Sequence, residues 1–326
     1  MASARRITPS AINALLVLAT VSATPVSAQA SQPTVVAIDG VLCDLTRTLV
    51  ASDAKVVCLI QPGSDPHNYR LKPSDRQALS SASLVLHNGY NLTPSANKIS
   101  SSAKVVAVAE KAIPTTDHAN HDNGHAEHGA HDHDESDPHV WHDPANSAAM
   151  VTVIAKRLAP VLPSTQQSAL TARAAEAIEV LNAVGDWGGK QFATIPENQR
   201  VLVSEHQAYS YLTNRYGLRQ ITMLDSFTTG GVLRPSSLRT ITAEVEGSGA
   251  QTLFPESLPV SKTLRRISRS TGLPVNGAPL FADGLAPNRS TVGTATLNIC
   301  TVVQGQGGQC DQAAADELMA RWSAIR

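Results

Sequence analysis

Eight of the eleven histidines of this chain lie between Asp117 and His142, in the stretch DHANHDNGHAEHGAHDHDESDPHVWH. Neutral imidazole is a good ligand for zinc, copper and nickel, and neighbouring carboxylates add negative charge. The tract has too little apolar surface to offset the entropy lost on ordering it. We therefore predict a mobile loop over residues 117–138 that binds metal ions, the alternatives being an accidental run of histidines like an affinity tag and a pH-responsive polar linker. Its candidate ligands are His118, His121, His125, His128, His131 and His133.

Four further side chains have the types and positions of a single metal site. His67 lies in GSDPHNY, His139 in DPHVWHDP and His206 in SEHQAY, and Asp283 follows an apolar run at residues 279–281. Three of the four follow apolar runs typical of strands, where parallel-sheet proteins place their ligand groups. Three imidazoles and one carboxylate satisfy the tetrahedral preference of zinc. The sequence therefore predicts one zinc site formed by these four residues.

Other polar residues lie near these four positions and are expected to have supporting or structural roles. Asp-Pro-His occurs twice, and the proline extends the preceding Asp, whose carboxylate is then placed to accept the spare imidazole N–H. His142 is an alternative ligand, a relay on the side of the His-rich loop, or a residue of the cleft wall. Glu205 is interpreted as a solvated or supporting carboxylate, Glu256 as a helix cap or supporting group, and His87 as structural.

Short apolar runs alternate with helical patterns over most of the chain. In the first half we expect strands over residues 34–38, 55–60, 84–87 and 104–108, and helices over 42–51 and 74–82. In the second half we expect strands over 200–203, 220–223, 252–254 and 279–281, and helices over 207–216, 237–247 and 261–271. This alternation favours parallel sheets covered by helices. The predicted fold is α/β, with two parallel-sheet lobes.

One long helix is expected between the two lobes. Its apolar residues recur at spacings of three or four: Leu170, Ala174, Ile178, Leu181, Val184 and Trp187. Ser164 is the expected N-cap, and Gly188-Gly189 should weaken or kink the helix. A rigid helix between two lobes leaves the interlobe cleft as the natural ligand site. The predicted domains are an N-terminal lobe over residues 32–162, a connecting helix over 163–194 and a C-terminal lobe over 195–326.

Composition and the N-terminal segment restrict the class of protein. The net charge is −1 and aromatic residues make up 4% of the chain, so neither a basic surface nor base-stacking platforms for nucleic acid are expected. Arg5 and Arg6 precede a short apolar run over residues 11–21, and Val26-Ser27-Ala28 supplies small residues for cleavage. Residues 1–28 are therefore predicted to be a signal peptide. No Cys follows the cleavage region, so we expect a periplasmic protein without direct membrane insertion, and a monomer.

The four cysteines predict two disulfides. Cys43, Cys58, Cys300 and Cys310 allow three connectivities, and an oxidising compartment favours disulfide formation. Cys43–Cys58 and Cys300–Cys310 are favoured, because each pair is close in sequence and lies within one lobe. A thiolate zinc site is the weaker alternative, since the chain has no C-x-x-C.

Over roughly residues 33–322 the chain resembles the periplasmic metal-binding components of ABC importers, in the zinc (ZnuA-like) branch of a family that also holds manganese binders. The similarity rests on GSDPHNYRLKPSD, LVLHNGYNL, DPHVWHDP, SEHQAYSYLTNRYGL, LFPESLPVSKTLRRISRSTGL and ADGLAP, in that order. The resemblance implies two α/β lobes, a rigid connecting helix and one metal held by His67, His139, His206 and Asp283. It also implies a His-rich acidic loop between the first two ligands.

Three functions are compatible with these features. The first is a high-affinity zinc-binding protein that delivers Zn²⁺ to an ABC-type permease in the inner membrane. The second is a periplasmic zinc buffer that stores metal on the loop. The third is a zinc hydrolase with Glu205 as general base, which is disfavoured because the chain has neither H-E-x-x-H nor a nucleophile elbow. We expect no enzymatic activity.

Overall fold

A computed structural model describes residues 1, 2, 4, 32–99, 101–114, 136–229 and 235–326. The chain divides into two compact units, Met1–Ser31 and Gln32–Arg326, and the fold described below is that of the second. The predicted signal peptide, apart from residues 1, 2 and 4, and the six histidines of the predicted loop lie outside the described residues. None of the helices in the described ranges is both long and apolar enough to cross a membrane.

The N-terminal lobe is built on a four-stranded parallel sheet, as predicted. Its strands are β1 (Thr34–Ala37), β2 (Lys55–Cys58), β3 (Leu84–His87) and β4 (Lys104–Ala107), in the order β2-β1-β3-β4. Three of the four contain a Val-Val pair, and β-branched residues suit a sheet that is covered on both faces. Because the strands are parallel, they all end at one edge of the sheet, and the loops that follow them begin there.

Helices cover both faces of this sheet. On one face α1 (Gly40–Val50) and α4 (Pro144–Leu158) share the main core with β1 and β3. On the other face, α2 (Pro73–Ser80) and the 3₁₀ helix η1 (Pro94–Lys98) cover a smaller apolar cluster. The remaining short elements are α3 (Val108–Ala112) and the 3₁₀ helix η2 (Val140–His142). Asp39 caps α1 through the N–H of Leu42 at 2.9 Å.

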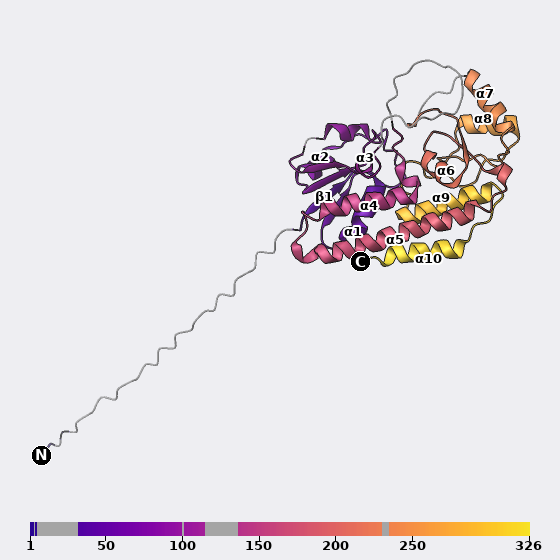
Figure 1. Cartoon of the computed structure of the whole chain (residues 1–326). Helices are drawn as coiled ribbons and strands as arrows, with labels where there is room; N and C mark the ends of the chain where they lie inside the picture. The colour runs from indigo at the N-terminus through magenta and orange to yellow at the C-terminus, as the bar shows by residue number, and fades with distance from the viewer. Residues whose placement is uncertain (3, 5–31, 100, 115–135, 230–234) are drawn as a thin grey trace. The chain divides into compact units, whose positions relative to one another are not determined.

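One long helix, α5 (Gln167–Phe192), connects the two lobes. It runs beside α9 (Thr291–Gly305) and α10 (Gln312–Ala324), as Figure 1 shows, and also packs against α4. Two details differ from the prediction. Ser164 begins a 3₁₀ turn, η3 (Ser164–Gln166), and does not cap α5. The helix continues through Gly188-Gly189. Gly188 allows Tyr216 to approach closely, since a Cβ there would lie 2.7 Å from the Tyr216 hydroxyl oxygen.

The C-terminal lobe has a smaller sheet than predicted. Among the described residues of this lobe, only β5 (Val201–Ser204) and β6 (Arg219–Thr222) pair as strands, and they are parallel. The expected strand at residues 252–254 runs beside β5, where the N–H of Phe254 donates to the Val203 carbonyl at 3.1 Å, but it forms only an isolated bridge. Residues 279–281 form no strand. Pro255, Pro274 and Pro279 lack the N–H that a continuous ladder requires.

Helices complete this lobe and its core. They are α6 (Ser210–Tyr216), α7 (Pro235–Glu246) and α8 (Lys262–Thr271), and a 3₁₀ turn, η4 (Glu197–Gln199), precedes β5. Leu264 and Ile267 of α8 are buried against Val203 and Ile221 of the sheet in one apolar cluster. The chain is thus an α/β protein of two lobes joined by one long helix.

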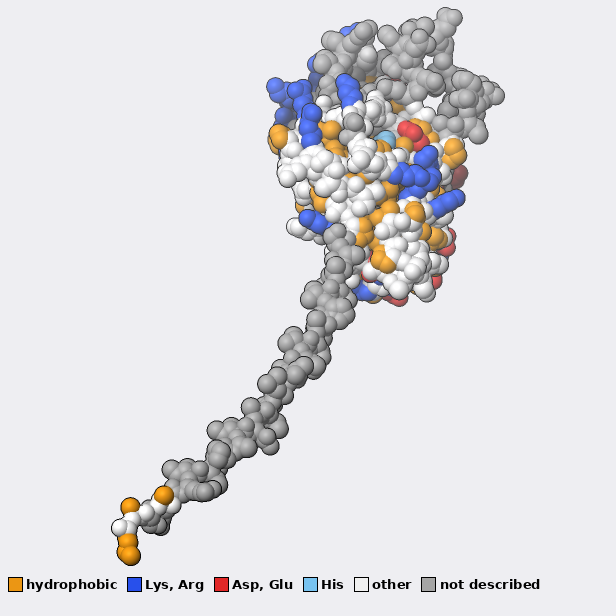
Figure 2. Space-filling view, turned by 90° about the vertical axis from the view of Figure 1, so that its left-hand side faces the viewer, with side chains coloured by type: hydrophobic (Ala, Val, Ile, Leu, Met, Phe, Trp, Pro, Cys, Tyr) orange, Lys and Arg blue, Asp and Glu red, His pale blue; other side chains and the backbone are white. Residues whose placement is uncertain are grey.

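Apolar side chains on the described surface are scattered. The large exposed hydrophobic residues among those described are Met1, Val105 and Leu258. The space-filling view likewise shows small separate patches of apolar side chains among Lys and Arg side chains (Figure 2). Exposed apolar residues dispersed in this way are ordinary for a folded domain.

The two disulfides pair as predicted. Cys43 on α1 is bonded to Cys58 at the end of β2, with the Cα atoms 5.6 Å apart. Cys300 on α9 is bonded to Cys310, just before α10, with a Cα separation of 5.3 Å. Each bond therefore joins neighbouring elements, and neither sulfur pair belongs to the group of potential metal ligands described below.

Removing either disulfide should lower stability without changing metal affinity. The bonds close loops of 15 and 10 residues, for which chain entropy gives about 3 kcal/mol each. We expect Cys43→Ala/Cys58→Ala and Cys300→Ala/Cys310→Ala to lose about that much free energy of unfolding in denaturant titrations. Unchanged stability would contradict the structural role, and a loss of metal affinity in the folded variants would contradict the separation from the metal site.

Candidate metal centre

Four side chains from distant parts of the chain converge on one point. Nε2 of His67 lies 3.3 Å from Nε2 of His139, and both lie close to Oδ1 of Asp283, at 3.1 and 3.2 Å. Nε2 of His206 lies 3.2 Å from the same oxygen. One atom from each residue lies within 4.8 Å of the others. The structure thus brings together all four residues of the predicted site.

The separations are compatible with one four-coordinate metal ion. Metal–ligand bonds of 2.0–2.1 Å place the corners of a tetrahedron about 3.3–3.4 Å apart; the His67–His139 distance and the three distances to Asp283 are 3.1–3.3 Å, and all four atoms lie within 4.8 Å of one another. In addition, three imidazole nitrogens surround a single carboxylate oxygen, which has only two lone pairs with which to accept hydrogen bonds. The geometry therefore suits a cation at the centre with the Nε2 lone pairs directed at it.

His139 is held by the second Asp-Pro-His segment. It lies immediately before η2, is completely buried, and donates its backbone N–H to Oδ1 of Asp137 at 2.9 Å. The same oxygen lies 2.8 Å from Nδ1 of the His139 ring. This contact puts the proton on Nδ1 and leaves Nε2 free to bind a metal. The predicted role of the preceding Asp is therefore confirmed at this position.

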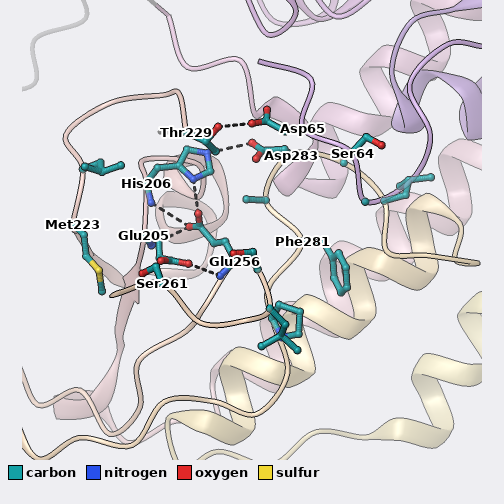
Figure 3. A pocket seen from close by; sticks show the side chains of 18 of the residues that line it. Ser64, Asp65, Glu205, His206, Met223, Thr229, Glu256, Ser261, Phe281 and Asp283 are labelled. Atoms are coloured by element: carbon teal, nitrogen blue, oxygen red, sulfur yellow. Dashed lines mark hydrogen bonds and ion pairs between the residues drawn. The ribbon is translucent and has the colours of Figure 1, made fainter. Parts of the chain in front are cut away.

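His206 is held by a pair of glutamates. It follows β5, and its Nδ1 lies 2.5 Å from Oε2 of Glu256. Oε1 of Glu256 accepts the backbone N–H groups of Glu205 and His206, at 3.0 and 3.2 Å, while Oε2 of Glu205 accepts the N–H of Glu256 at 2.9 Å. Figure 3 shows these contacts. Glu256 therefore orients His206, and Glu205 fixes the segment that carries Glu256.

His67 is held differently from His139. Its backbone N–H donates to Oδ1 of Asp65 at 2.8 Å, but the Asp65 carboxylate does not reach the ring. Nδ1 of His67 is buried without a hydrogen-bond partner among the described residues. Oδ2 of Asp65 accepts instead from Asn68 and from Thr229. The expectation that this Asp also orients its imidazole is thus wrong.

Asp283 lies on a loop that several contacts fix in place. Asn298 of α9 accepts the N–H of Phe281 and donates to its carbonyl, both at 3.0 Å. Nε2 of His142 lies 2.8 Å from the Ala282 carbonyl. Further along, the N–H of Gly63, a residue with φ of +79°, donates to the Leu285 carbonyl at 3.2 Å. The loop is thereby tied to the segments that carry His67 and His139.

Burial and charge shift the pKa values of the cluster. Burial lowers the pKa of His206, but hydrogen bonds to Asp283 and Glu256 outweigh it and raise the pKa to about 10. Burial also lowers the pKa of His139, but the hydrogen bonds to Asp137 and Asp283 outweigh it and raise the pKa above its ordinary value. Burial would raise the pKa of Asp283, yet the imidazole hydrogen bonds hold it well below its ordinary value. The partly buried carboxylates of the cluster therefore favour positive charge beside them, from protons or from a metal.

Three other polar residues have roles that the structure now defines. His142 is buried and bonded to a backbone carbonyl; burial and then the charge of His139 lower its pKa to about 4. It is not in the group of potential ligands. His87, at the end of β3, lies outside that group as well. Thr229 was not predicted, because no motif marks it and only the fold brings it to Asp65.

A cavity of about 620 Å³ lies beside the centre. Asp65, Glu205, Glu256 and Asp283 contribute carboxylates to its lining, and His206 lies at its wall (Figure 3). No Lys or Arg is among its described lining residues. The approach to the centre is therefore acidic, which favours a cation.

Solved structures of other proteins share this fold. The zinc-binding protein TroA of Treponema pallidum matches with a TM-score of 0.74 and 24% identity, covering 84% of this chain and 99% of that one. Fe(III)-bound YtgA of Chlamydia trachomatis matches with a TM-score of 0.75 and 21% identity, covering 86% and 99%. At these identities the likeness establishes the fold alone.

Sequence comparison identifies the family. TroA is 27% identical over 284 residues, covering 83% of this chain and 88% of that protein. The manganese ABC transporter substrate-binding lipoprotein PsaA of Streptococcus pneumoniae is 23% identical over 277 residues, covering 84% and 88%. The model of the ZnuA family, described as zinc-uptake complex component A, periplasmic, matches residues 35–298. The chain therefore belongs to the ZnuA family of metal ABC transporter substrate-binding proteins.

Proposed function

We propose that this protein binds Zn²⁺ in the periplasm and delivers it to the permease of an ABC importer. The observation that carries the proposal is the convergence of three imidazole nitrogens and one carboxylate oxygen within 4.8 Å of one another, with each Nε2 atom 3.1–3.2 Å from Oδ1 of Asp283. In this proposal His67, His139, His206 and Asp283 are the metal ligands. Zn²⁺ is the cargo, so the site serves capture and release.

The choice of zinc rests on the donor atoms. Manganese favours oxygen ligands, whereas imidazole suits zinc and the tetrahedral arrangement is the one zinc prefers. Relatives carry different metals in their names, zinc in TroA and manganese in PsaA. Family membership therefore does not choose the metal, and the three nitrogen ligands support zinc.

The acid–base groups near the centre support binding and not catalysis. Catalytic zinc keeps one position open for water and needs a nearby general base. Here four protein groups surround the centre, and Glu205, the candidate base, accepts the backbone N–H of Glu256. We therefore propose a solute-binding protein without enzymatic activity that acts as a monomer, with residues 1–28 directing export.

We propose the same division of the chain as the sequence predicts: lobes over residues 32–162 and 195–326 and a connecting helix over 163–194. In this division the first lobe supplies His67 and His139 and the second supplies His206 and Asp283. Zinc binding then joins the lobes, which links occupancy of the site to closure of the cleft.

Replacing His206 by Ala should abolish tight zinc binding without unfolding the protein. Mutating the hydrogen-bond partner of a metal ligand can lower metal affinity by roughly a hundredfold, and loss of the ligand itself should lower it further. We expect this loss in competition titrations with a chelator, and slower zinc uptake in cells whose only copy of the protein is His206→Ala. His87→Gln is the matched control, since His87 lies outside the centre. Wild-type affinity in folded His206→Ala would refute the ligand assignment.

Replacing Glu256 by Gln should weaken zinc binding by about tenfold to a hundredfold. The amide has one oxygen in place of two, so it cannot accept both from His206 Nδ1 and from the two backbone N–H groups that Glu256 now binds. Isothermal titration with Zn²⁺ measures the change. An effect as large as that of His206→Ala would indicate that Glu256 is itself a ligand.

Deleting residues 117–135 should remove weak zinc sites and keep the tight one. We propose that this His-rich segment collects or senses zinc through its six histidines. Titration of the deletion variant should show one zinc equivalent, against several in the full chain. Several equivalents in the deletion variant would place the weak sites elsewhere.

A further inference from the structure

The aspartates of the two Asp-Pro-His segments, Asp65 and Asp137, make different contacts. In both, Oδ1 of the Asp accepts the backbone N–H of the His, at 2.8 Å for Asp65 and 2.9 Å for Asp137. Asp137 then also takes the ring Nδ1 of its own His139. Asp65 leaves the ring of His67 and turns Oδ2 toward Thr229 and Asn68, at 2.5 and 2.8 Å. The second oxygen of Asp65 therefore accepts a hydrogen bond across the cleft (Figure 3).

Thr229 is fixed to the segment that presents His206. It lies in the loop after β6, where the N–H of Leu224 donates to the Glu205 carbonyl at 2.9 Å. The N–H of Gln207 donates to the Ser226 carbonyl in the same loop at 3.0 Å. The backbone on both sides of His206 is thus bonded to the loop that carries Thr229. The Asp65–Thr229 contact consequently joins the His67 segment to the His206 segment without involving the metal position.

We infer that Asp65, Asn68 and Thr229 form an interlobe latch that holds the cleft closed and sets the rate of metal release. The inference rests on the proposed function, because the cargo must leave through the cleft. Asp65 and Thr229 act as positioning residues: neither is among the four candidate ligands. Opening the cleft separates His67 from His206 and must break the latch at the same time.

The chemistry of the latch is complementary. The Thr229 hydroxyl has one proton, which it donates to the Asp65 carboxylate, and its lone pairs face Asn68 Nδ2 at 3.3 Å. A hydrogen bond to an ionised carboxylate is stronger than one between neutral groups. Asp65 and Thr229 are half-buried, so water competes only partly with the contact. Loss of such a bond corresponds to about a tenfold change in the opening equilibrium.

Thr229→Val is the decisive variant, because it removes the hydroxyl while keeping the shape and the charge. Zn²⁺ release is followed by stopped-flow mixing with an excess of chelator, and the Co²⁺ absorption spectrum reports the ligand geometry. We expect release about tenfold faster than in the wild type, with an unchanged association rate and an unchanged Co²⁺ spectrum. A release rate equal to that of the wild type, or an altered Co²⁺ spectrum, would overturn the latch.

Two further variants separate the latch from general destabilisation. Thr229→Ser restores the hydroxyl and should restore slow release; fast release in this variant would contradict the inference. Asp137→Asn removes the partner of the His139 ring and not the latch, so it should change the Co²⁺ spectrum. If Asp137→Asn released zinc quickly and kept the wild-type spectrum, a change outside the latch would accelerate release as well. Fast release would then not be specific to the latch, and this result would contradict the inference.

A measurement on the metal-free protein keeps this inference distinct from the zinc proposal. The N–H of His67 is bonded to Asp65, so amide hydrogen exchange over residues 64–69 should be faster in Thr229→Val than in the wild type. Absence of zinc binding in the wild type would refute the proposed function, whatever the exchange rates. Unchanged exchange in Thr229→Val would refute the latch, whatever the affinity for zinc.

Discussion

Three partly buried carboxylates facing three imidazoles form the interaction on which the rest of the structure depends. Asp137 and Glu256 each bind the outer nitrogen of one ring, and Asp283 lies among the three inner nitrogens. Removing such charges from water is costly unless positive charge balances them. The raised pKa values of His139 and His206 show that protons can provide this balance. A divalent cation provides it without protonating the rings, so the cluster is suited to exchanging protons for metal.

The fold assembles this cluster from segments that end at two sheets. His67 leaves the N-terminal sheet after β2, and His206 leaves the C-terminal sheet directly after β5. Parallel strands place such loops at a common edge, and α5 with α9 forms a packed support beneath both lobes. An ion pair between Arg215 of α6 and Asp143 at the start of α4, at 3.2 Å, also joins the lobes. The ligands thus meet in the cleft because rigid elements carry them there.

Release requires that this arrangement be reversible. Ligands from both lobes make a closed cleft favourable when metal is bound, yet each metal–ligand contact opposes release. Contacts away from the metal, such as that between Asp65 and Thr229, adjust the opening equilibrium without changing the donor atoms. The acidic lining of the adjoining cavity favours a cation on its way in or out. In the proposed function, affinity therefore depends on the four converging residues and the exchange rate on the contact between Asp65 and Thr229.

The sequence by itself determined the types of the four converging residues, the two disulfides, the four-stranded sheet and the long helix, since each depends on local pattern or short spacing. It over-predicted the second sheet, because apolar runs near Pro255 and Pro279 look like strands although they cannot complete a ladder. It also gave the two Asp-Pro-His segments the same role. Only the tertiary structure decided that Asp137 orients its own histidine while Asp65 binds Thr229, 164 residues away in sequence. A hydrogen bond depends on which groups folding brings within about 3 Å of one another, and local sequence does not contain that distance.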